Sequence, residues 1–122
     1  MKLVDTSSWI EQLRRGGNAG VRLRVEELLS AGEAAWCPIV RLELWNGARG
    51  QAERRVLRAM EAVLPSLEIG PPVWERAVKL AAAARTKGVT VPASDLLVAA
   101  CAWQHEIAIE HSDSHFDLIR TL

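Results

Sequence analysis

Short apolar segments, each followed by a helix-starting signal, constrain the fold of this chain more than any other feature. Leu3-Val4 ends at Asp5-Thr6-Ser7-Ser8, a run of good helix caps, and apolar residues at helical spacing follow. Residues 34–37 end at Pro38, which takes the first helical position that proline favours. Strands that alternate with helices predict a mostly parallel sheet covered by helices on both faces. The predicted fold class is therefore α/β.

The same pattern continues to the end of the sequence. Strands are predicted at residues 3–4, 34–37, 66–69 and 107–109. Helices are predicted from residue 7 or 8 to a stop at 16–17, then over 19–31, 38 to about 47 or 50, 51–63, 73–87 and 92–105, with a short last helix around 116–119. No linker, repeat or low-complexity segment interrupts this order. Residues 1–122 are therefore predicted to form a single domain.

Composition excludes several specialised classes of protein. Apolar residues make up 49% of the chain, and 15 acidic residues balance 15 basic ones, so net charge indicates neither a nucleic-acid-coating nor a membrane-surface protein. The sequence starts without a basic leader, and its longest apolar-rich run, residues 96–103, is too short to span a membrane. We therefore expect a cytoplasmic protein in which Cys37 and Cys101 are reduced core residues.

Four acidic residues occupy equivalent places in the predicted topology. Asp5 follows the first strand, and Asp113 lies a few residues after the fourth. Glu43 lies in the helix after the second strand, and Asp95 falls in the first turn of the helix that Pro92 opens. Strand ends and helix starts of a parallel sheet meet at one edge, where ligands bind in such sheets. The four carboxylates are therefore predicted to converge there.

A cluster of four carboxylates favours a bound cation. Two carboxylates about 5 Å apart repel by roughly 3 kcal/mol at an effective dielectric constant near 20, so the cluster either takes up protons or binds metal. Oxygen ligands without cysteine or clustered histidine favour Mg²⁺ or Mn²⁺ over zinc. One or two such ions can hold a phosphodiester, activate a water and neutralise the leaving oxygen. The pattern therefore predicts metal-dependent cleavage of phosphodiester bonds.

Each acid, taken alone, also has a structural interpretation. Asp5 and Asp113 could cap the helices that follow them. A carboxylate at Asp95 is favoured by the helix dipole, and Glu43 could be an ordinary solvated helix residue. Only the joint pattern of four acids supports the metal-site interpretation.

Four segments of the chain resemble the PIN domain, in the form found in VapC-type toxins of bacterial and archaeal toxin–antitoxin pairs. The segments are residues 3–7, 42–43, 91–100 and 111–116, and together they span nearly the whole chain. The resemblance implies a three-layer α/β/α fold with a short, mostly parallel sheet of four strands, or five where relatives add a last edge strand. It also implies a Mg²⁺- or Mn²⁺-dependent endoribonuclease that acts on RNA, forms a homodimer and is inhibited by a small VapB-like antitoxin.

The resemblance also implies roles for individual residues. It assigns the metal-binding and catalytic roles to four carboxylates: Asp5, Glu43, Asp95 and Asp113. Thr6 or Ser7 corresponds to the hydroxyl beside the family's first aspartate, which would orient a carboxylate. His115 stands where the family often has an acid just before the phenylalanine, and Asp117 follows it. Whether His115 or Asp117 contributes to the site stays open.

Other interpretations remain to be distinguished. A receiver-type phosphoacceptor switch needs an aspartate at the end of a middle strand, but the third predicted strand ends in Ile69-Gly70. A non-toxin PIN nuclease that processes RNA and a catalytically silent partner-binding module both fit the sequence. Four arginines near the first two helices either contact an RNA backbone or form a solvated basic face: Arg14, Arg15, Arg22 and Arg24.

Overall fold

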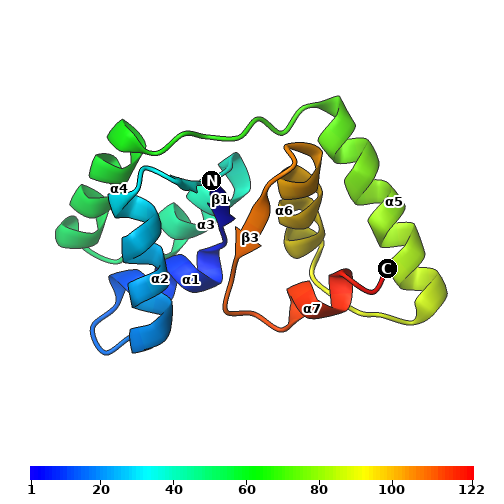
Figure 1. The fold of residues 1–122 in the computed structure, drawn as a ribbon, viewed down its shortest axis with the longest axis horizontal. Helices are drawn as coiled ribbons and strands as arrows, with labels where there is room; N and C mark the ends of the chain where they lie inside the picture. Colours follow the sequence, from blue (N-terminus) through cyan, green and yellow to red (C-terminus); the bar gives the residue numbers. More distant parts are fainter.

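The computed structural model describes all residues from 1 to 122 (Figure 1). Three strands and seven helices follow in the order β1 (Lys2–Val4), α1 (Thr6–Leu13), α2 (Ala19–Ser30), β2 (Ala34–Ala35), α3 (Pro38–Gly47), α4 (Gln51–Val63), α5 (Pro71–Lys87), α6 (Ala93–Gln104), β3 (Ala108–Glu110) and α7 (His115–Ile119). In Figure 1, α1, α2 and α4 lie to one side of β1 and β3, α5 to α7 lie to the other, and α3 overlaps β1 in this view. The predicted α/β class is confirmed.

The strands form one parallel sheet with the order β2-β1-β3. In the central strand, Leu3 lies opposite Ala35 on one side and Ile109 on the other. Leu3 and Val4 are fully buried, which explains why this short strand is wholly apolar at its end. The pairing with β3 continues one step further, because the Asp5 amide donates to the Glu110 carbonyl at 2.9 Å.

The prediction of a four- or five-stranded sheet was wrong, because residues 66–69 do not form a strand. They make only one parallel bridge, between Ser66 and Trp36. The Trp36 amide donates to the Pro65 carbonyl at 3.1 Å, and the Leu67 amide donates to the Trp36 carbonyl at 2.8 Å. The pairing cannot extend, because the neighbouring chain turns into α3 at Pro38. A strand needs a partner of matching length, and here the partner ends.

Helix α6 lies at the centre of the packing. Residues 96–102 are all buried, and the helix contacts α3, α5, α7 and β3. A helix that is apolar on every side belongs in a core, and its alanines allow neighbouring elements to approach closely. Cys37 and Cys101 are fully buried and free, as predicted. None of the helices combines the length and apolar character that crossing a membrane requires.

Ala100 tests how tightly α6 is packed. We expect Ala100→Leu to lower the free energy of unfolding by about 1–3 kcal/mol, because the added atoms have no space around a fully buried position. Ala82→Leu, on the exposed side of α5, is the matched control and should change stability little. Urea unfolding of the three proteins measures both effects. Equal stability of both variants would contradict a close-packed α6.

Candidate metal centre

Asp5 lies between β1 and α1 and caps the helix. Its Oδ2 accepts hydrogen bonds from the Ser7 amide at 3.0 Å and the Ser7 hydroxyl at 2.7 Å. The residue is only 3% exposed. The capping interpretation of Asp5 is therefore correct, yet capping uses one oxygen only. Oδ1 accepts no hydrogen bond within the chain and remains available to a ligand.

Glu43 reaches the same place from α3. Its Oε1 accepts a hydrogen bond from the Thr6 hydroxyl at 2.9 Å, and the residue is half-buried. Burial raises the pKa of Glu43, the Thr6 hydrogen bond lowers it, and the charges of Asp5 and Asp95 raise it further. Glu43 is therefore not an ordinary solvated helix residue, because it faces the other predicted carboxylates.

Asp95 and Asp113 meet at His115. The His115 Nδ1 lies 2.9 Å from Asp95 Oδ2 and 3.1 Å from Asp113 Oδ1. One ligand atom from each of these three side chains lies within 4.8 Å of the other two. Burial raises the pKa of Asp95, the His115 hydrogen bond lowers it, and the charges of Asp5 and Asp113 raise it. Asp113 Oδ1 also accepts a hydrogen bond from the His115 amide at 2.9 Å, just before α7, whose cap residue is Ser114.

The structure thus brings all four predicted carboxylates to one rim, at the carboxyl ends of β1 and β3. Two of them come from the ends of strands or the loops after them, and two come from helices α3 and α6. Asp117 does not join them, because its side chain is 67% exposed and its nearest cation is Arg120 at 4.0 Å. Of the two residues left open, only His115 lies in the cluster.

A hydrogen bond between α1 and a buried glutamate of β3 was not predicted from the sequence. Glu110, at the end of β3, is only 5% exposed, and its Oε2 accepts from the Ser8 hydroxyl at 3.0 Å. Arg24 Nε lies 2.8 Å from Oε1, and the interaction with Glu110 raises the pKa of Arg24. Both oxygens of Glu110 are therefore occupied, which makes it a structural anchor. Arg24 lies on a solvated face, one of its two predicted places, and also forms this ion pair.

Successive hydroxyls in the first turn of α1 therefore serve different acids. Thr6 donates to Glu43, Ser7 to Asp5 and Ser8 to Glu110. Ser7 has a second role, because its Oγ accepts from the Ser112 amide at 3.0 Å and its carbonyl accepts from the Ser112 hydroxyl at 3.2 Å. One residue thus ties the Asp5 carboxylate to the loop that carries Asp113.

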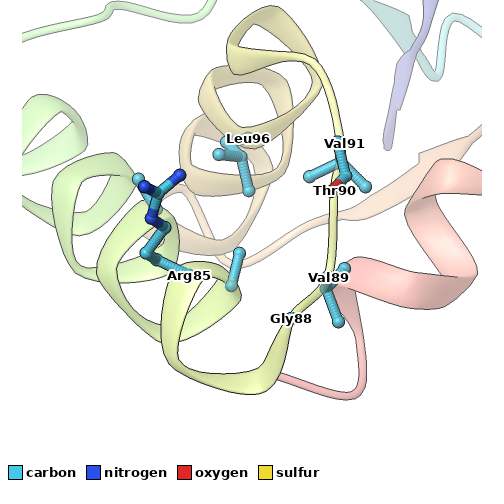
Figure 2. A pocket seen from close by; sticks show the side chains of 8 residues that line it. Arg85, Gly88, Val89, Thr90, Val91 and Leu96 are labelled. Atoms are coloured by element: carbon cyan, nitrogen blue, oxygen red, sulfur yellow. The ribbon is translucent and has the colours of Figure 1, made fainter.

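The donor set at this rim fits a divalent cation. Carboxylate oxygens are the ligands that Mg²⁺ and Mn²⁺ prefer, and none of the four carboxylates forms a salt bridge with an arginine or lysine. The pocket in Figure 2, between the end of α5 and the start of α6, has no such chemistry. Its only charged lining residue is Arg85, and none of the four carboxylates lines it.

Comparison with known proteins identifies the family of the chain. A family model described as the PIN domain matches residues 2–122. The chain therefore belongs to the PIN domain family. Its relatives within that family include ribonuclease VapC11 of Mycobacterium tuberculosis, 35% identical over 98% of this chain and 91% of the relative. Ribonuclease VapC51 of the same organism is 33% identical over 96% of this chain and 83% of the relative.

Solved structures share the fold. VapBC-1 from nontypeable Haemophilus influenzae has a TM-score of 0.76 to this chain, with 18% identity, over 99% of this chain and 93% of that one. FitAcB from Neisseria gonorrhoeae has a TM-score of 0.73, with 21% identity, over 100% of this chain and 94% of that one. The predicted PIN-like architecture is thus confirmed at the level of the fold, with three strands in place of four or five.

The raised pKa of Glu43 predicts a change of stability with pH. Without metal, Glu43→Gln should raise the free energy of unfolding at pH 7.5 by about 0.5 kcal/mol, a small gain because solvent screens the half-buried carboxylate. The folded protein binds the Glu43 proton more tightly, so the cost of the charge grows as pH rises above the ordinary value of 4.5. The gain should therefore vanish below that pH.

Urea unfolding in EDTA at pH 4 and pH 7.5 measures this difference. The amide of the glutamine in Glu43→Gln keeps an acceptor for the Thr6 hydroxyl, so the substitution changes mainly the charge. Glu27→Gln, on the exposed face of α2, is the control and should show no such pH dependence. A loss of stability in Glu43→Gln at pH 7.5 would contradict the inferred repulsion.

The Glu110 anchor predicts a second stability effect. Arg24→Met should lower the free energy of unfolding by about 1–2 kcal/mol, because the buried carboxylate loses its cation while Arg24 itself is half exposed. Arg22→Met, on the same helix and without an ion pair, should have little effect. Thermal unfolding at pH 7.5 compares them. Equal melting temperatures for the two variants would show that the pair contributes nothing.

Proposed function

We propose that this chain is a divalent-metal-dependent endoribonuclease and the toxin of a toxin–antitoxin pair. The convergence of Asp5, Glu43, Asp95 and Asp113 at one rim carries the proposal. Membership of the PIN domain family and relatives named as VapC ribonucleases support RNA as the substrate. The rim is open to solvent at Asp95, Asp113 and Glu43, so a phosphodiester can reach the carboxylates.

Asp5, Glu43, Asp95 and Asp113 would hold one or two Mg²⁺ or Mn²⁺ ions. Such ions, when bound, polarise a phosphoryl oxygen, make a water nucleophilic at neutral pH and neutralise the leaving oxygen. The chain contributes the positions of the carboxylates. Ser7 fixes the orientation of Asp5, and Thr6 fixes that of Glu43. These hydrogen bonds hold like charges together before any cation arrives.

We also propose that a small VapB-like antitoxin inhibits the protein and that the protein forms a homodimer. Solved structures of similar fold are named as VapBC-1 and as FitAB bound to a DNA fragment, which supports a protein partner. Large apolar side chains are exposed on α1, α3 and α4, where a partner helix would bury them. They are Ile10, Leu13, Leu42, Val56 and Val63.

Cleavage of a mixed panel of RNAs by the purified chain tests the proposal. We expect cleavage with Mg²⁺ or Mn²⁺, none with EDTA, and a loss of roughly 100-fold or more in Asp95→Asn, because it removes a charged donor from the site. Asp117→Asn is the matched control, since Asp117 lies outside the cluster on α7. Its activity should stay within about threefold of the unchanged chain.

Other outcomes identify the alternatives. Cleavage that survives both EDTA and Asp95→Asn would indicate a contaminating nuclease, and no cleavage of any RNA by antitoxin-free protein would favour a silent binding module. Metal-dependent cleavage without growth arrest on expression in a bacterial host would favour a non-toxin nuclease of RNA processing. Growth arrest that Asp95→Asn abolishes would support the toxin.

A further inference from the structure

His115 is the one nitrogen donor among the clustered carboxylates. It is the first residue of α7, and the next residue, Phe116, is buried and fixes this turn in the core. The His115 amide donates to Asp113 Oδ1, which holds the ring beside that carboxylate. Its Nδ1 points between Asp95 and Asp113, while the side chain is 38% exposed. The ring therefore enters the cluster through Nδ1 and keeps its other edge near solvent.

The distances around Nδ1 match those between adjacent ligands of one ion. With metal–ligand bonds of about 2.1 Å in an octahedron, neighbouring ligand atoms lie about 3.0 Å apart. Nδ1 lies 2.9 Å from Asp95 Oδ2 and 3.1 Å from Asp113 Oδ1. Nδ1 therefore lies at a ligand-to-ligand distance from two carboxylate oxygens at once. A cation shared by all three side chains would satisfy each of them.

We propose that His115 Nδ1 is a ligand of the divalent cation and makes this site prefer Mn²⁺ to Mg²⁺. The inference rests on the proposed function, because it concerns the cation of the same rim. Mn²⁺ belongs to the first-row transition series, whose ions bind at nitrogen as well as oxygen sites, whereas Mg²⁺ is bound through oxygen. A neutral ring that coordinates through Nδ1 carries its proton on Nε2. The exposed part of His115 allows that tautomer without a buried unpaired donor.

The two other histidines do not have this geometry. His111 Nδ1 accepts a hydrogen bond from the Asp113 amide at 3.3 Å, and its ring packs on Phe116 with centroids 4.9 Å apart. His105 Nε2 lies 2.8 Å from the Glu68 carbonyl, at the opposite end of α6 from Asp95. His111 therefore provides a matched control close to the site, and His105 a remote one.

Pulsed electron paramagnetic resonance of Mn²⁺ bound to the full chain tests the ligand directly. Protein labelled with ¹⁵N-histidine should show the hyperfine coupling of a directly bound nitrogen. His115→Asp keeps a ligand at this position but replaces nitrogen with oxygen, so Mn²⁺ should stay bound and the coupling should disappear. His111→Asn should keep the coupling. Circular dichroism of each variant checks that the fold is retained.

Calorimetric titration with each metal tests the preference. The ratio of the Mg²⁺ to the Mn²⁺ dissociation constant should fall by about tenfold in His115→Asp, because the oxygen ligand favours Mg²⁺. His105→Asn should leave the ratio unchanged. An unchanged ratio in His115→Asp would contradict the proposed preference.

The two proposals can fail separately. Bound Mn²⁺ without nitrogen coupling, together with metal-dependent RNA cleavage, would overturn the role of His115 and leave the nuclease standing. Nitrogen coupling that His115→Asp removes, without cleavage of any RNA, would support the ligand and contradict the nuclease. Absence of Mn²⁺ binding to the unchanged chain would overturn both.

Discussion

Mutual repulsion of the carboxylates at the sheet rim is the constraint that the surrounding structure must overcome. Burial raises the pKa of Glu43 and Asp95, and neighbouring acids add to the effect in each case. The first turn of α1 opposes it with two hydroxyls, because Thr6 donates to Glu43 and Ser7 donates to Asp5, while the next hydroxyl, of Ser8, donates to the Glu110 anchor. Because these donors lie on a single turn, the positions of the acids relative to one another depend on where α1 starts. Asp5 sets that start, since it caps the helix and also belongs to the cluster. The hydrogen bonds between Ser7 and Asp5 therefore both cap α1 and orient a carboxylate of the site.

Much of this arrangement could be predicted from the sequence, because local signals determine it. The cap residues after Leu3-Val4 and the proline at 38 locate helix starts, and helix starts locate acids on a parallel sheet. The resemblance of four segments to the PIN domain added the roles. The absence of the third predicted strand could not be foreseen, because the pairing of residues 66–69 depends on how soon the neighbouring segment turns into α3. The Glu110–Arg24 pair could not either, since its partners lie far apart in the sequence. An acid that ends an apolar strand was the only local signal for it.

A sheet of three short strands has few strand ends that can carry site residues, so helices supply two of the four carboxylates. Glu43 and Asp95 lie on helices α3 and α6, and α6 is buried along most of its length. The buried core of α6 gives Asp95 a rigid base, although the carboxylate itself lies at the open end of the helix. His115 approaches Asp95 from a further helix, α7. The site thus rests on the buried strands and α6, and further side chains reach it from α3 and α7. The four carboxylates can therefore lie close together although the sheet is small.

The separation of these side chains along the chain has a consequence for protein synthesis. Residues 5, 43, 95 and 113 are far apart in sequence, and the Ser7–Ser112 hydrogen bonds join the first and last of their segments. During translation, the carboxylates cannot gather until the segment around residues 112–115 has left the ribosome and packed against α1. A growing chain without this segment lacks Asp113 and His115, two of the three side chains that gather around Asp95. For a chain that cleaves RNA, the order of synthesis would itself keep a nascent molecule harmless to the messenger and ribosome that are producing it.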